Sequence, residues 1–430
     1  GAMMMLLVFL ALLLAGVPLA FSLMASGLLF FVMHDSLPVL VAVQRMVSSS
    51  QSFPLLAVPF FILAGHIMNA SGITSRLISF ANLLVCWISG GLAHVTIVLS
   101  ALMGGVSGSA IADAAMQARI LGKPMEDSGL PRGFSAAIIT VSALITACIP
   151  PSIGLILYGY MGNVSIGKLF IAGLFPGALL TIALMLCVRW VASSQKLGNT
   201  ETQKPPAFRE VMSAAGRCKW ALLFPVLLIV TIRWGIFTPS EAGAFAVVYA
   251  VLVGLFAYRE LTIAELYSAL NESVRDIGMI MLIVLAAGTA GYVIAFQQLP
   301  VELAQSVSAV TQSPLLVLMI CLALLLVIGT LMEGTITVLL LTPILVPVIQ
   351  SVGIDPVHFG ILLVLVVTFG GTTPPVGIAM YTVCNIMDCP ITQFIRHVWP
   401  FYLTVLVVLL LLALLPELVL FLPDYVYATP

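Results

Sequence analysis

A pattern repeated at a constant spacing is the feature that most restricts how this chain can fold. Six residues between positions 105 and 151 reappear with the same identity 224 positions later. The matched pairs are Gly105/Gly329, Ile120/Ile344, Leu121/Leu345, Gly129/Gly353, Pro150/Pro374 and Pro151/Pro375. Two Pro-Pro pairs in apolar surroundings at one fixed offset indicate a duplicated unit. The chain is therefore predicted to consist of two related halves.

The apolar content of both halves predicts that they lie in a membrane. Hydrophobic residues make up 61% of the chain, charged residues make up only 8%, and the mean hydropathy is +1.20. Apolar stretches of about 20 residues recur along the whole chain, and each can cross a hydrocarbon core of roughly 30 Å as a helix. They do not alternate apolar and polar residues as barrel strands would. We expect an all-α polytopic membrane protein.

Several function classes are disfavoured by the sequence. A formal net charge of −1 gives no reason to expect nucleic acid as a partner. The chain has no Walker motif and no glycine-rich dinucleotide fingerprint, so ATP-driven transport by this chain alone is not expected. Seven scattered cysteines form no CxxC pair, which argues against a disulfide framework or a soft-metal site. No nucleophile has a base at a recognisable spacing, so we predict that the chain is not an enzyme.

The boundaries of the two halves follow from a polar segment near the middle of the chain. Residues 189–219 hold six of the sixteen Lys and Arg residues, an excess that predicts a cytoplasmic location. The predicted organisation is a first repeat, a linker and a second repeat, each repeat carrying one helical hairpin and one broken helix. These parts are residues 1–190 with hairpin 92–121 and broken helix 133–160, linker 191–219, and residues 220–430 with hairpin 315–348 and broken helix 358–387.

Each hairpin is predicted to be re-entrant, because glycines separate two apolar arms. In the first hairpin, arms 92–105 and 110–121 are each too short to span, and Gly108 lies between them. Irregular backbone at membrane depth is tolerated only where protein or water covers it. For residues 6–33 the sequence leaves open whether one kinked span or two short elements form.

Basic residues orient the two repeats. No Lys or Arg occurs between Arg275 and Arg396, whereas the matching part of the first half has Arg119, Lys123 and Arg132. This asymmetry predicts that the two hairpins open toward opposite sides of the membrane. Two repeats of inverted topology are the plan of many secondary transporters.

Both Pro-Pro pairs create sites that can hold ions. A proline removes an amide donor and frees the carbonyl one turn earlier, so Pro150-Pro151 and Pro374-Pro375 leave carbonyls that can coordinate a cation. The helix N-termini after each break can hold an anion. The alternative is a plain proline kink, which is common in membrane helices.

Two acidic residues lie near the predicted hairpin tips. Asp113 follows Ser107 and Ser109, and a carboxylate inside the membrane marks an ion or substrate pathway by default. Hydroxyl, carbonyl and carboxylate oxygens suit a small hard cation such as Na⁺. Glu333 and Thr337 occupy the second hairpin. The alternatives are that Asp113 only hydrogen-bonds within the protein and that Glu333 reaches water at the outer mouth.

Five motifs, in order along the chain, carry a family resemblance. They are residues 58–65 (VPFFILAG), 107–113 (SGSAIAD), 149–152 (IPPS), 235–243 (GIFTPSEAG) and 371–377 (GTTPPVG). Together they resemble the large membrane subunit (DctM type) of tripartite ATP-independent periplasmic (TRAP) transporters. The resemblance covers essentially the whole chain.

The resemblance implies a sodium-coupled importer of small organic acids, such as dicarboxylates or sugar acids, in the bacterial inner membrane. It implies an elevator architecture like that of the ion-transporter superfamily, in which hairpins and broken helices move against a scaffold. It also implies two protein partners besides the lipid bilayer. These are a small membrane subunit of about four helices and a periplasmic substrate-binding protein.

The family motifs imply a set of site residues at both tips. For substrate they are Ser107, Ser109, Asp113, Ser152, Glu333 and Thr337. For Na⁺, the first region is Ser107, Ser109, Pro150 and Ser152, and the second is Glu333, Thr372, Thr373, Pro374 and Pro375. Two rival functions stay open: a dicarboxylate carrier of related architecture that needs no binding protein, and an intramembrane hydrolase that pairs Asp113 with Glu333.

Overall fold

The chain is helical throughout the part that the structure describes. This computed structural model describes residues 1–198 and 204–428, and every regular element in these ranges is a helix, as predicted. The first elements are α1 (Ala2–Leu14), α2 (Leu19–Met33), α3 (Val39–Ser50), η1 (Phe53–Leu56), α4 (Ala57–Ala70), α5 (Ile73–Val85), α6 (Leu92–Gly104), α7 (Ala110–Asp127), α8 (Arg132–Cys148), α9 (Ile153–Gly162) and α10 (Ile166–Gln195).

The remaining elements follow the same pattern of long helices joined by short turns. They are α11 (Phe208–Arg217), α12 (Lys219–Arg233), α13 (Pro239–Leu252), the π-helical η2 (Val253–Ala257), α14 (Ile263–Phe296), α15 (Leu299–Val310), α16 (Pro314–Leu331), α17 (Gly334–Ser351), α18 (Pro356–Gly370), α19 (Ile378–Ile386), α20 (Ile391–Leu414) and α21 (Pro416–Ala428).

The helix lengths fit a protein with many membrane crossings. Among the described residues, seven helices are long and apolar enough to cross a bilayer, and counting two sharply bent pairs as single spans gives up to nine. The bent pairs are α8 with α9, at 45°, and α11 with α12, at 73°. Both arms of the second hairpin, α16 and α17, reach 18 residues. Because that length permits a span, the re-entrant form of this hairpin stays a prediction.

Helices are now defined in two segments, residues 6–33 and the predicted linker. Residues 6–33 form two helices, α1 and α2, separated by a turn in which Gly16 has a φ of +84°. The predicted linker is mostly helical, because α10 continues to Gln195 and α11 occupies 208–217. Linker residues 196–198 and 204–207 are not helical, and residues 199–203 lie outside the described ranges.

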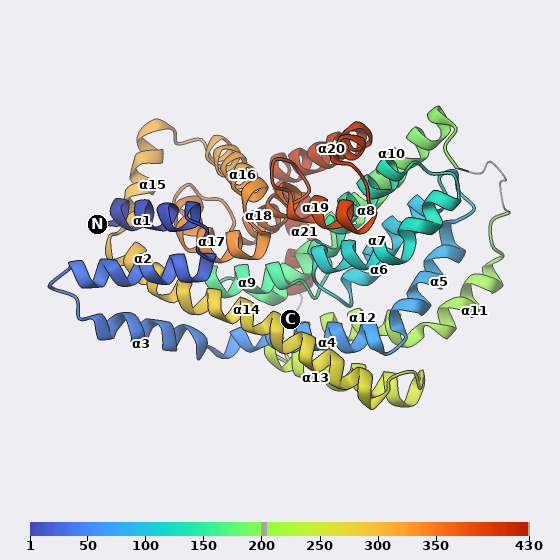
Figure 1. Cartoon of the computed structure of the whole chain (residues 1–430), viewed down its shortest axis with the longest axis horizontal. Helices are drawn as coiled ribbons and strands as arrows, with labels where there is room; N and C mark the ends of the chain where they lie inside the picture. Colours follow the sequence, from blue (N-terminus) through green and yellow to red (C-terminus); the bar gives the residue numbers. More distant parts are fainter. Residues whose placement is uncertain (199–203, 429–430) are drawn as a thin grey trace.

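Both predicted broken helices form, and each is interrupted at its Pro-Pro pair. The first is α8 and α9 around Pro150-Pro151, and the second is α18 and α19 around Pro374-Pro375. These helices are central in the molecule (Figure 1). Every residue of α8 from Gly133 to Cys148 is buried, and so is nearly all of α18.

Small and hydroxyl-bearing residues explain why α8 can occupy the centre. Such residues let helix backbones approach closely in membranes. The buried hydroxyls of Ser135 and Thr140 donate to carbonyls one turn earlier, those of Pro131 and Ala136, so no unpaired donor remains. A side chain at Gly360 of α18 would collide with the ring of Tyr158 in α9. The Tyr158 hydroxyl donates to the Pro356 carbonyl at 2.6 Å and so joins the two halves.

The hairpins α6–α7 and α16–α17 lie on different sides of the broken helices (Figure 1). The first hairpin packs against α8, and α16 packs against α18. In the second hairpin, Gly329 and Gly370 bring the α16 and α18 backbones together, since a Cβ on Gly370 would lie 2.6 Å from the Gly329 carbonyl carbon. Each hairpin thus contacts the broken helix of its own half, and α7 and α17 also contact α19 and α9 of the other half. These contacts together position the two tips.

Candidate functional site

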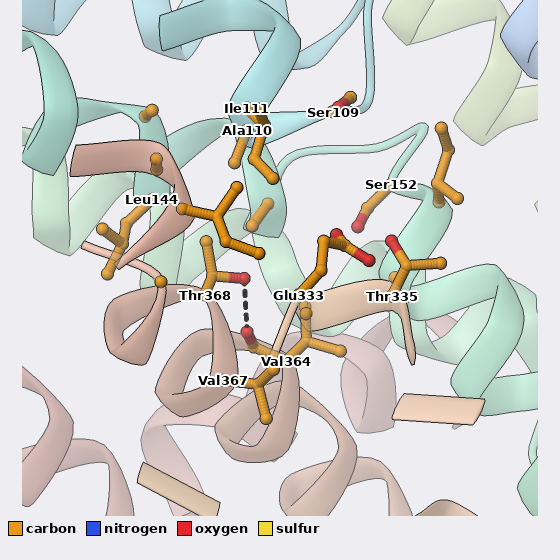
Figure 2. A pocket seen from close by; sticks show the side chains of 18 of the residues that line it. Ser109, Ala110, Ile111, Leu144, Ser152, Glu333, Thr335, Val364, Val367 and Thr368 are labelled. Carbon is orange, nitrogen blue, oxygen red and sulfur yellow. Dashed lines mark hydrogen bonds between the residues drawn. The ribbon is translucent and has the colours of Figure 1, made fainter. Parts of the chain in front are cut away.

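A cavity of about 130 Å³ lies where the two hairpin tips meet the two helix breaks. Its lining comes from all four of these segments. They contribute Gly108, Ser109, Ala110 and Ile111 from the first tip; Ser152, Ile153 and Gly154 after the first break; Glu333, Gly334 and Thr335 from the second tip; and Gly371, Thr372, Ile378 and Ala379 around the second break. Segments more than 220 positions apart in sequence therefore share one small chamber (Figure 2).

Four helix N-termini converge on this cavity. The first residues of α7, α9, α17 and α19 all line it. The side-chain oxygens of Ser109, Ser152 and Glu333 cap three of these helices, accepting backbone N–H groups at 3.3–3.4 Å. A helix N-terminus carries a partial positive charge of about +0.5. Together these termini favour an anion in the cavity without any basic side chain.

Each tip is fastened to the break of its own half by a backbone hydrogen bond. The Gly108 carbonyl accepts the Ile153 N–H at 3.3 Å, and the Thr330 carbonyl accepts the Gly377 N–H at 3.2 Å. The offset of 224 that relates the two halves also relates Ile153 to Gly377. Equivalent amides after the two breaks thus hold the two tips.

Glu333 provides the only carboxylate among the cavity-lining residues, and no Lys or Arg lines the cavity. Its side chain is half-buried and lies beside Ser152 and Thr335 in Figure 2. One carboxylate oxygen accepts the Ile336 N–H at 3.3 Å, which fixes the side chain at the start of α17. Glu333 therefore lines the cavity at the start of α17.

The predicted site residues divide into two groups. Ser109, Ser152, Glu333 and Thr372 line the cavity. The others lie outside its lining: Ser107, Asp113, Pro150, Thr337, Thr373, Pro374 and Pro375. The Ser107 hydroxyl donates to the Met103 carbonyl, and the buried Thr337 hydroxyl donates to the Glu333 carbonyl, so both support the tips from behind. Pro374 and Pro375 are exposed, whereas Pro150 is buried.

Asp113 lies in a closed polar network between α6, α7 and α8. Its side chain is 1% exposed. The carboxylate accepts the Ser100 hydroxyl at 3.0 Å, the Thr146 hydroxyl at 2.8 Å and the Gln117 amide at 3.0 Å. Ser100 also contacts the Ser142 hydroxyl at 3.3 Å. This arrangement joins both arms of the first hairpin to the first broken helix.

Sequence reasoning missed most partners in the network and several cavity residues. Gln117 could have been predicted from the sequence, because it lies four positions after Asp113 and so shares its helix face. Thr335 follows Glu333 closely enough to have been included with the second tip. Thr140 and Thr368 gave no signal, since buried hydroxyls are common on membrane helices. The Thr368 hydroxyl donates to the Val364 carbonyl at 2.7 Å, as the dashed line in Figure 2 marks.

Comparison with known proteins shows the family of this chain. A family model described as the DctM component of the tripartite ATP-independent periplasmic transporters matches residues 6–418. The chain belongs to the DctM family. It is 39% identical over 415 residues to the sialic acid TRAP transporter large permease SiaM of Vibrio cholerae, covering 96% of both chains.

Two further DctM-family relatives are named after different acids. The 2,3-diketo-L-gulonate large permease YiaN of Escherichia coli is 34% identical, over 97% of this chain and 98% of that protein. The C4-dicarboxylate large permease DctM of Pseudomonas aeruginosa is 36% identical, over 89% and 88%. The chain is therefore a multi-pass membrane transporter subunit and not an enzyme, so the hydrolase alternative is wrong.

Two solved structures share the fold of this chain. The YdaH transporter of Alcanivorax borkumensis matches with a TM-score of 0.61 at 15% identity, over 86% of this chain and 87% of that one. MtrF of Neisseria gonorrhoeae matches with a TM-score of 0.54 at 14% identity, over 87% and 83%. At such low identity the likeness shows the fold alone.

Proposed function

We propose that this chain is the large permease of a sodium-coupled uptake system for a small organic acid. The observation that carries the proposal is the composition of the cavity between the tips. Four helix N-termini favour an anion there, while Glu333 adds a negative charge and no basic side chain lines the walls. An anionic substrate therefore needs a cation to enter beside this carboxylate.

The residues around the cavity suit Na⁺ better than a transition metal. Among the described residues, no group of three His, Cys, Asp or Glu side chains could hold a metal ion. The Ser109 and Ser152 hydroxyls each accept one backbone N–H and keep a second lone pair. With the carbonyls freed by Pro150-Pro151 they would form the first ion region. Glu333, Thr372 and the carbonyls freed by the second break would form the other.

Bound Na⁺ would offset the charge of Glu333 and add to the partial positive charge of the helix N-termini. Moving one net charge across 100 mV provides about 2.3 kcal/mol, enough for nearly fiftyfold accumulation. The helix N-termini would orient the acid group of the substrate, and the hydroxyls would hold its remaining oxygens.

The rest of the transport machinery follows from the family. We propose that a small membrane subunit enlarges the scaffold and that a periplasmic binding protein delivers the substrate, in the inner membrane of a bacterium. In an elevator mechanism, the hairpins and broken helices would move together past the remaining helices. The hydrogen bonds that fasten each tip to its own break support such joint movement.

Uptake in liposomes tests sodium coupling and the need for a binding protein together. We expect vesicles containing this chain and its small subunit to accumulate the acid only with an inward Na⁺ gradient and the binding protein. The control replaces Na⁺ by K⁺ at equal ionic strength. Full uptake in K⁺ would contradict sodium coupling. Full uptake without the binding protein would favour the rival self-sufficient carrier.

Glu333→Gln tests the role assigned to the cavity carboxylate. We expect the Na⁺ concentration for half-maximal uptake to rise about tenfold, which corresponds to a loss of about 1.4 kcal/mol of cation binding. Glu302→Gln in α15 is the matched control, because Glu302 is exposed and lies outside the cavity. An unchanged Na⁺ requirement in Glu333→Gln would remove this residue from the second ion region.

A further inference from the structure

A second cavity, of about 790 Å³, has the opposite charge character to the first. It lies between α5, α11, α12 and the end of η2, at the edge of the molecule (Figure 1). Arg76, Arg217 and Lys219 line it, and none of its lining residues is acidic. A pocket with three cations and no acid favours a ligand with concentrated negative charge.

Two of these cations are uncompensated. Arg76 is tied to Glu260 at 2.7 Å and lies 3.9 Å from the centre of the Tyr258 ring, so its charge is partly neutralised and its position is fixed. Arg217 and Lys219 are exposed, and neither forms an ion pair within the described ranges. The positive potential of the pocket therefore comes mainly from Arg217 and Lys219.

Helix α11 has the form of a helix that lies on a membrane surface. Phe208 and Met212, one turn apart, are 79% and 54% exposed. Helical spacing places Arg217 on the side opposite this apolar face and Arg209 at its flank, as in amphipathic interfacial helices. The axis of α11 turns by 73° into the apolar α12. If α12 crosses the bilayer, α11 follows its surface, and the basic corner between them lies at headgroup depth.

An exposed apolar strip leads from this corner along α12. Leu223, Val226 and Val230 are 40%, 55% and 42% exposed and share one helix face. The strip begins one turn after Lys219. A ligand with an anionic head and a long apolar tail matches both features at once, whereas a soluble anion would use only the charges.

We propose that this cavity binds the headgroup of an anionic phospholipid. Arg217 pairs with the phosphodiester through its forked guanidinium, Lys219 adds a second charge, and the acyl chains lie on the α12 strip. Basic pockets beside membrane helices recognise anionic lipids in this way. The site is independent of the transport cavity, because the two share no lining residue.

Photo-crosslinking tests the proposal on the full chain assembled with its small subunit. The protein is reconstituted in phosphatidylcholine vesicles with trace phosphatidylglycerol or phosphatidylcholine that carries a photoactivatable acyl chain. Labelling is then mapped by mass spectrometry to residues 208–233. We expect the phosphatidylglycerol probe to label this segment about tenfold more than the phosphatidylcholine probe. Excess inorganic phosphate in the buffer should not reduce the labelling.

Two matched variants complete the test. Arg217→Gln/Lys219→Gln should lower phosphatidylglycerol labelling to the phosphatidylcholine level, and the charge-conserving Arg217→Lys/Lys219→Arg should keep most of it. Lys204→Gln/Arg209→Gln removes the same charge from residues outside the cavity and should change labelling less than about twofold. Equal labelling by both probes, equal loss in both Gln variants, or full competition by phosphate would overturn the proposal.

Discussion

Replacing Asp113 by alanine is expected to abolish sodium-dependent uptake in liposomes and to lower the melting temperature of the protein. The reason is the closed network in which the carboxylate accepts donors from three helices. Removing it leaves the Ser100, Gln117 and Thr146 donors buried without this partner, at about 1–3 kcal/mol for each group that finds no replacement. The polar contact between the first hairpin and α8 would then weaken, which would shift the tip on the cavity wall.

Asp113→Asn distinguishes this positioning role from a role of the charge itself. The Gln117 Oε1 atom is buried without a hydrogen-bond partner, so it can accept the new amide if the Gln117 side chain turns over. We therefore expect Asp113→Asn to keep uptake within about threefold, a difference below 1 kcal/mol. Asp127→Ala, on the exposed end of the same helix, should have little effect. Loss of uptake in Asp113→Asn with normal melting would instead favour the carboxylate as an ion ligand.

Gly108→Ala is the second change for which we expect nearly complete loss of uptake. Gly108 has a φ of +65°, where a non-glycine residue costs about 1–2 kcal/mol. The added Cβ would also collide with the Pro151 carbonyl oxygen, which is backbone and cannot move aside alone. The tip would have to shift away from the first break, breaking the hydrogen bond between Gly108 and Ile153. Initial rates of uptake measure the effect.

Gly353→Ala is the matched control for that experiment. Gly353 has a φ of +82°, but nothing lies within 4 Å of the position of its Cβ. It therefore carries the same backbone penalty without the collision, and uptake should stay within about twofold. Comparable losses in the two variants would mean that backbone strain, and not the contact between tip and break, limits transport.

The constant offset made the centre of the fold predictable from the sequence. Pro-Pro pairs and glycine-rich turns act through local backbone chemistry, so both helix breaks and both hairpin turns could be located without tertiary information. Four of the residues that it singled out, Ser109, Ser152, Glu333 and Thr372, line one cavity in the structure. All four lie within a few residues of a break or a tip.

Contacts between residues from different helices could not be predicted from the sequence, because they depend on tertiary packing. Asp113 and Ser109 are close in sequence, yet Ser109 is the N-cap residue of α7 with an extended backbone and lines the cavity. Asp113 lies inside α7, and its side chain points toward α6 and α8. Its partners Ser100 and Thr146 come from other helices, and no local pattern relates them to Asp113. The pocket beside α11 was missed for a similar reason, because α5 contributes Arg76 to it from a distant part of the chain.

The two backbone bonds that fasten the tips have a consequence for gating. Each bond joins a tip to the break of the same half, because Gly108 pairs with Ile153 and Thr330 pairs with Gly377. Breaking one of these hydrogen bonds costs about 1 kcal/mol and leaves the other hydrogen bond intact. In the predicted arrangement, in which the two hairpins open toward opposite sides of the membrane, one tip would release its break while the other stays bound. Such sequential release would prevent a continuous leak across the bilayer.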